Sequence, residues 1–83
     1  MGFKNQGFEV VLASPPDYEE LTAEISFDGK FVALVSRERG IDQLEIEIPG
    51  LDLDENQIVR KVSLKGFLDA VEIACKRLRG EIK

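Results

Sequence analysis

The sequence predicts an α+β fold, an antiparallel meander sheet of four strands with one C-terminal helix packed on one face. Three runs rich in β-branched and aromatic residues follow one another between residues 21 and 48. Their connections contain turn signals, Asp28-Gly29 and a polar loop that ends in Gly40. The last third of the chain carries apolar residues at helical spacing, which predicts the helix.

The first strand is expected at residues 8–13, before these three runs. Every second residue from Phe8 to Leu12 is apolar, as in a strand with one buried face. The loop at residues 14–17 contains two prolines, which cannot donate hydrogen bonds to a sheet, so the strand ends there. Residues 1–6 are expected to form a flexible N-terminus.

The Asp28-Gly29 pair predicts a two-residue type I′ hairpin turn, because both residues tolerate a positive φ. The turn length then sets the register of the two strands. The expected pairs are Phe27 with Lys30, Ser26 with Phe31, Ile25 with Val32, Glu24 with Ala33, Ala23 with Leu34 and Thr22 with Val35.

A three-residue loop at residues 38–40, with Gly40 in a left-handed conformation, is expected in the next hairpin. It would place Leu34 opposite Leu44 and Val32 opposite Ile46. The core face would then carry Leu21, Ala23, Ile25, Val32, Leu34, Leu44, Ile46 and Ile48. The outward face would carry Thr22, Glu24, Ser26, Phe31, Ala33, Val35, Gln43, Glu45 and Glu47.

The helix is expected to begin after Ser63, a suitable N-cap, and to end at Gly80. Its apolar stripe consists of Leu64, Phe67, Leu68, Val71, Ala74, Cys75 and Leu78. Ile73 lies on the opposite side of the helix and is expected to be exposed or to touch a second subunit. Two interpretations stay open for the preceding segment: residues 58–62 alternate like a short fifth strand, which we favour, and residues 54–57 suit a helical turn.

The 83 residues form one domain, 1–83, with a thin core. No apolar run approaches the roughly 20 residues of a membrane-spanning helix, and the start lacks a signal-peptide core, so we expect a cytoplasmic protein with no membrane contact. The chain has no histidine and one cysteine, Cys75, expected as a buried apolar residue. The acidic run at residues 52–56 resembles a calcium loop but lacks the glycine and glutamate required later in such loops. We therefore expect no enzyme, no catalytic residues, no metal and no cofactor.

The net charge of −5 is unevenly distributed. Residues 17–55 hold twelve acidic and three basic residues, or −9, and residues 56–83 hold three acidic and seven basic residues, or +4. Binding of phosphates needs a basic surface, so nucleic acid is not an expected partner. An acidic sheet face instead favours a basic protein partner.

The outward face holds the candidate binding residues, since Phe31, Ala33 and Val35 would form an apolar patch there with glutamates around it. The expected partner-binding residues are Glu24, Phe31, Val35, Glu45 and Glu47. Scattered exposed apolar residues are the alternative explanation of the patch. Tyr18, in the loop before the second strand, either recognises a partner or folds back over the edge of the core.

The segments 21–25, 28–36, 44–49 and 59–62, with Phe67-Leu68-x-Ala70, resemble short bacterial α+β proteins, some of which are immunity proteins against secreted toxins. The resemblance covers residues 8–79 and brings no catalytic motif or binding residue. The function expected is a small acidic protein-interaction module, an immunity or inhibitor protein that binds a basic partner through its exposed sheet face. The alternative is a homodimer with a structural or small-ligand-binding role, although facing acidic clusters would repel each other in a face-to-face dimer.

Overall fold

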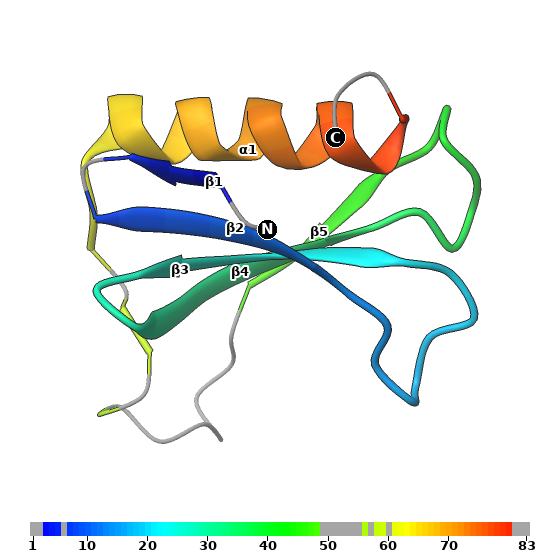
Figure 1. Ribbon diagram of the computed structural model, residues 1–83, viewed down its shortest axis with the longest axis horizontal. Coiled ribbons are helices and arrows are strands. Elements are labelled where there is room, and N and C mark those ends of the chain that lie inside the picture. The colour runs from blue at the N-terminus through cyan, green and yellow to red at the C-terminus, as the bar shows by residue number, and fades with distance from the viewer. Residues whose placement is uncertain (1–2, 6, 49–55, 57, 60, 81–83) are drawn as a thin grey trace.

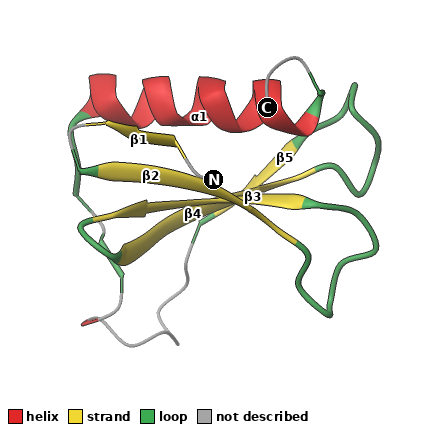
Figure 2. Ribbon diagram, in the orientation of Figure 1, coloured by secondary structure: helices red, strands yellow, loops and turns green. Residues whose placement is uncertain are grey.

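The computed structural model describes residues 3–5, 7–48, 56, 58–59 and 61–80. Five strands in chain order form one antiparallel sheet, and a helix lies across one of its faces (Figures 1 and 2). The elements are β1 (Phe3–Asn5), β2 (Phe8–Ala13), β3 (Thr22–Phe27), β4 (Lys30–Ser36), β5 (Glu45–Glu47) and α1 (Leu64–Leu78). The α+β fold, the meander and the packing of the C-terminal helix on one sheet face are confirmed. In the described residues, no helix is long and apolar enough to cross a membrane.

The additional strand lies at the N-terminus. Phe3–Asn5 pairs with β2, so the prediction of a flexible N-terminus is wrong at these three residues. Gly7 has a φ of 90°, a conformation that glycine adopts readily, and this lets the chain reverse between β1 and β2. The outer edge of β2 thereby gains hydrogen-bond partners from its own chain.

The strand expected at residues 58–62 is not present in the described part of that segment. Ile58 forms a single parallel bridge with Phe31 of β4, and the Val59 N–H donates to the Phe31 carbonyl at 2.9 Å. Of the alternative helical turn at residues 54–57, only Asn56 lies within the described residues.

The Asp28-Gly29 turn forms as predicted, with φ of 51° and 81°. The expected register holds for the two pairs nearest the turn, and then a β-bulge shifts it. Val32 is left over, and Ala33 takes its place opposite Ile25. Because side chains alternate along a strand, this one-residue shift turns the rest of β4 over, and the pairs predicted beyond the bulge are wrong.

The connection between β4 and β5 is longer than the predicted three-residue loop. The turn at Gly40, whose φ is 104°, is present, but β5 begins only at Glu45. The observed pairs are Leu34 with Glu47, Val35 with Ile46 and Ser36 with Glu45. Relative to the prediction, the bulge exchanges the two faces of β4, and the longer loop exchanges the faces again before β5. As a result β5 keeps its predicted orientation, with its glutamates outward, and only β4 beyond the bulge is reversed.

The core lies between α1 and the sheet. It consists of Phe8, Val10, Ala23, Ile25, Val32, Ala33, Val35, Ala70, Ala74 and Leu78. Ala33 and Val35, which were expected on the outward face, are part of this core because of the bulge. Leu34 lies between them in the strand and therefore points to the outward face, where it is nevertheless buried.

The ends of α1 agree with the prediction. The Gly66 N–H donates to Ser63 Oγ at 3.2 Å, which makes Ser63 the N-cap, and Gly80 follows the helix with a φ of 79°. The residues buried against the sheet recur every four positions: Gly66, Ala70, Ala74 and Leu78. Three of these four are small, so the helix axis can lie close to the sheet, mainly over β2 and β3 and less over β4.

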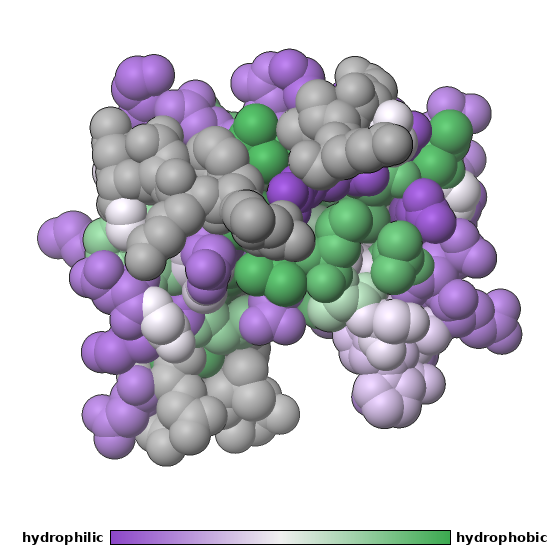
Figure 3. Space-filling model, viewed as in Figure 1, coloured by the Kyte–Doolittle hydropathy of each residue, from purple (hydrophilic) through white to green (hydrophobic). Residues whose placement is uncertain are grey.

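The buried face of α1 is therefore rotated from the predicted apolar stripe. Leu64 and Leu68, which were expected in the core, are 71% and 54% exposed. Ile73, which was expected to be exposed or to touch a second subunit, packs against the core, as Val71 and Cys75 also do, and Cys75 is half-buried. Apolar side chains also reach the surface elsewhere: on the face shown in Figure 3, hydrophilic side chains occupy most of the margin and hydrophobic ones gather in the middle.

Candidate functional site

The outward face, defined as the sheet face that does not contact α1, carries the glutamates predicted to bind a partner. Glu24 of β3 and Glu47 of β5 lie in one row across the strands, with Leu34 of β4 between them. Two strand spacings separate their backbones by roughly 10 Å. Glu45 lies two residues from Glu47 and points the same way. The side chains of all three glutamates are exposed to solvent.

The two apolar residues predicted for this surface are separated by the structure. Phe31 precedes the bulge and lies half-buried on the outward face. Val35 lies on the other side of β4 and is 2% exposed, so the prediction that it contacts a partner is wrong. Val11 of β2, opposite Glu24, is 41% exposed and supplies an apolar side chain that the sequence analysis missed. The alternation of buried residues in β2 could have identified it.

Tyr18 connects the loop between β2 and β3 to β5. Its hydroxyl donates a hydrogen bond to Oε1 of Glu47 at 2.6 Å. This bond, together with partial burial and the charge of Glu47, raises the pKa of Tyr18 to about 12, because an ionised phenol could not donate the bond and would repel the carboxylate. The bond holds the loop over the outward face at β5, whereas a position over the edge of the core was expected; recognition of a partner by Tyr18 stays a prediction.

Little of the negative charge on the outward face is neutralised by neighbouring residues. Nε of Arg39 lies 3.3 Å from Oε2 of Glu45, but both side chains are more than half exposed, so solvent screens this ion pair. Glu9 also lies on this face, opposite Lys4 of β1. Among the described residues, the side chain of Glu24 has no hydrogen bond and no ion pair. Glu24 therefore presents negative charge to solvent on the central strand, and Glu47 does so on the edge strand β5.

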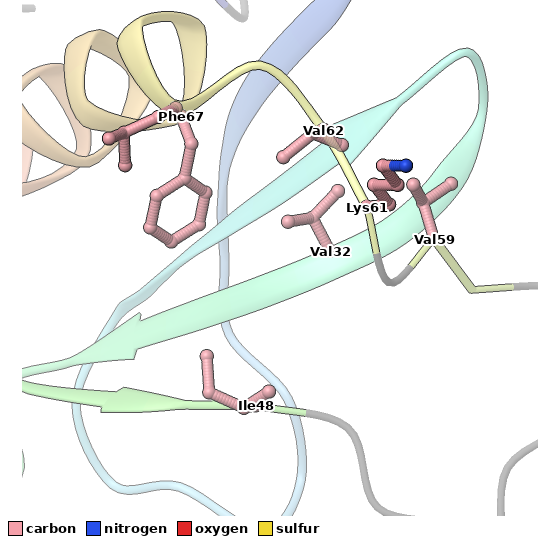
Figure 4. A pocket seen from close by; sticks show the side chains of 7 residues that line it. Val32, Ile48, Val59, Lys61, Val62 and Phe67 are labelled. Atoms are coloured by element: carbon pink, nitrogen blue, oxygen red, sulfur yellow. The ribbon is translucent and has the colours of Figure 1, made fainter.

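An apolar groove opens on the opposite side of the sheet, beside the N-terminal half of α1 (Figure 4). Its volume is about 470 Å³, and its lining consists of Val32, Ile48, Val59, Lys61, Val62, Leu64 and Phe67. The Phe67 ring points from α1 into the space between helix and sheet, and Ile48 lies across that space from it. The groove forms because α1 covers β2 and β3 and leaves the β5 side of the same face open.

These two surfaces offer carboxylates and apolar side chains as groups for binding. The described residues contain no group of three or more histidine, cysteine or acidic side chains placed to hold a metal ion. Most of the calcium-like run at residues 52–56 lies outside the described residues.

Comparisons with known proteins do not assign a function, so the outward face and the apolar groove are the features from which a function can be inferred. The predicted resemblance to bacterial immunity proteins stays a prediction. The chain matches no protein-family model, no curated protein and no solved structure.

Proposed function

We propose that this protein is an interaction module that binds a basic protein partner through its outward face. The observation that supports it is the set of exposed glutamates on one side of the sheet, Glu24, Glu45 and Glu47. Glu24 has no charged partner among the described residues, and Glu47 is bound by a neutral phenol, which leaves its charge in place. The face therefore offers the charges of Glu24 and Glu47, and the weakly paired Glu45, to incoming lysine and arginine side chains.

The arrangement suits a transient interface. Val11 lies opposite Glu24, and Phe31 is half-buried on the same face, so the outward face adds apolar contact area to its carboxylates. A negative surface speeds the encounter with a basic partner and disfavours acidic ones. The rigid sheet keeps the carboxylates at defined spacings, so less side-chain freedom is lost on binding.

Within this function, the finer proposal is an immunity or inhibitor protein. Carboxylates that bind lysine and arginine can occupy the phosphate-binding groove of a nuclease, because that groove is built to attract the negative phosphates of nucleic acid. The excess of acidic residues in 17–55, which include Glu24, Glu45 and Glu47, supports this choice of partner class. The interaction would then weaken as salt concentration rises.

Capture of the partner from a native bacterial lysate tests the proposal with two matched charge reversals. Glu24→Lys changes the centre of the outward face and leaves the bond between Tyr18 and Glu47 in place. Asp69→Lys makes the same change in net charge on α1, in the other layer of the fold, where Asp69 forms only a weak pair with Lys65 at 3.6 Å. Circular dichroism of both variants checks that the fold is kept.

The expected result is one stoichiometric partner that is retained by wild type and by Asp69→Lys, released by salt, and lost or bound more slowly by Glu24→Lys. Equal retention by the two variants would show that the outward face is not the binding site. Capture that does not respond to salt would contradict the electrostatic basis of the proposal.

A further inference from the structure

α1 carries a second apolar surface along the flank beside the groove, partly packed against the core and partly exposed. We call it the seam, and it consists of Leu64, Leu68, Val71 and Cys75. Its spacing of four, three and four residues is that of the a and d positions of a coiled coil. Leu64 and Leu68 are mostly exposed, and Val71 and Cys75 are half-buried. The sheet covers the small residues of α1, while Leu64 and Leu68 stay exposed and Val71 and Cys75 keep part of their surface accessible.

The seam is more than a scatter of exposed side chains. Leu64 belongs both to the seam and to the apolar groove, so the two surfaces are continuous. Ile46 and Ile48 add apolar surface at the adjacent edge of the sheet, where they are 44% and 64% exposed. A contiguous apolar surface of this kind marks a site of interaction in soluble proteins, whereas single exposed leucines do not.

We propose that a second copy of this chain docks on the seam, with the two α1 helices antiparallel about a two-fold axis. This arrangement places Leu64 opposite the partner's Cys75 and Leu68 opposite the partner's Val71. Each contact joins a larger side chain to a smaller one. A two-fold interface must be complementary to itself, and the seam meets this condition along its length.

The charges beside the seam select the antiparallel arrangement. Lys65 and Glu72 are seven residues apart and lie along the same edge of the seam. In an antiparallel pair Lys65 faces the partner's Glu72. Because of the two-fold axis, this ion pair occurs twice in the dimer. In a parallel pair Glu72 would instead face the partner's Phe67, and the charge pairing would be lost.

Both charged side chains are placed to reach across such an interface. The side chains of Lys65 and Glu72 are 87% and 62% exposed. Their present partners, Asp69 at 3.6 Å and Lys76 at 3.1 Å, are i,i+4 neighbours on the same helix and hold them weakly. The dimer would leave the outward face open, because the seam lies in the other layer of the fold, and it avoids the repulsion between acidic faces.

Disulfide formation tests the direction of the helices. Leu64→Cys keeps the native Cys75, so mild oxidation should join the two chains at both ends of the seam, position 64 of each to the partner's Cys75. The wild-type protein should not cross-link, because its two Cys75 thiols lie at opposite ends of the dimer. The double variant Leu64→Cys/Cys75→Ser should not cross-link either. Cross-linking of wild type through Cys75, or none by Leu64→Cys, would overturn the arrangement.

Sedimentation equilibrium from micromolar to millimolar protein tests the dimer itself. Wild type should show twice the mass of one chain, and Leu68→Asp should show a monomer. Val11→Asp makes the same kind of change at an exposed position on the other sheet face and should stay dimeric. The proposal is refuted if wild type is monomeric over the whole range of protein concentrations. Binding of another protein or a small ligand to the seam of that monomer would not rescue it.

The pairing of Lys65 with the partner's Glu72 can be tested separately by exchanging the two charges. Lys65→Glu alone and Glu72→Lys alone should each raise the dissociation constant of the dimer roughly tenfold, and the double swap should restore it. Absence of this restoration would contradict the antiparallel pairing. These residues lie on α1, so a failure of the dimer proposal would not affect the proposal that the outward face binds a basic partner. A failure of partner binding would likewise not affect the dimer proposal.

Discussion

Gly66 of α1 lies against the ring of Phe8 in β2, so closely that a Cβ at position 66 would come within 2.6 Å of Cε2 of that ring. Phe8 is 1% exposed and packs edge-on against Phe27, with the ring centroids 4.9 Å apart. The ring therefore has little room to move aside. The absence of a side chain at position 66 is what lets α1 approach β2.

This contact predicts that Gly66→Ala destabilises the protein. At an exposed helix position the same change would stabilise by up to ~1 kcal/mol. Here we expect a net loss of roughly 1–3 kcal/mol in the free energy of unfolding, because the methyl group overpacks the core. Urea denaturation measures it, and Gly66→Ala combined with Phe8→Leu should lose less than the sum of the two single changes. A single variant as stable as wild type would show that α1 shifts easily.

The bulge in β4 predicts opposite outcomes for two valines. Val35→Ala should lower the free energy of unfolding by about 2 kcal/mol, because Val35 is buried in the core opposite Ala23 of β3. Val11→Ala, the same change at a partly exposed position, should change it by less than about 0.5 kcal/mol. Urea denaturation of both variants checks this, and similar losses for the two would contradict the bulged register.

The bond between Tyr18 and Glu47 predicts a high pKa for the one tyrosine of the chain. Since the folded-state pKa of about 12 lies above the ordinary value of 10.0, the native state holds the phenolic proton more tightly. The bond therefore contributes stability below pH 10 and loses this contribution as the pH rises through 12. Ultraviolet titration of the tyrosinate measures it directly, and Glu47→Gln should bring the midpoint back toward 10.0. An unchanged midpoint in that variant would exclude Glu47 as the cause.

Arg37 is expected to hold the C-terminal end of α1. Its Nη1 donates to the Leu78 carbonyl at 2.7 Å, and that carbonyl, in the last turn, has no partner within the helix. Its Nε lies 3.2 Å from Oε1 of Glu20 as an ion pair without hydrogen-bond geometry.

Arg37→Met should therefore lower the free energy of unfolding by about 1–2 kcal/mol, through loss of the charge-assisted hydrogen bond. It should also speed amide hydrogen exchange in the last turn of α1. Glu20→Gln, which removes only the ion pair, serves as the control and should cost less than about 1 kcal/mol. Equal losses for both variants would assign the effect to the ion pair instead.

The sequence predicted the elements with local signals and mispredicted what depends on long-range packing. The Asp28-Gly29 turn and the Ser63 cap formed as expected. Among the predicted binding residues, Glu24, Glu45 and Glu47 lie together on the outward face, with Phe31 half-buried beside them. Val35 does not lie on this face, because the bulge in β4 turns the rest of the strand over. A bulge adds one residue to a strand without a distinctive sequence signal, so it was not predicted.

By itself, then, the amino-acid order determined the α+β class, the presence of four of the five strands, the Asp28-Gly29 turn, the extent of α1 and the uneven distribution of charge. These properties depend on residue type and on neighbours a few positions away. Only the tertiary structure decided which flank of α1 is buried, which way β4 faces beyond its bulge, and that Tyr18 reaches Glu47. These outcomes depend on close contacts between residues far apart in the chain, such as Gly66 and Phe8, whose fit no local pattern records.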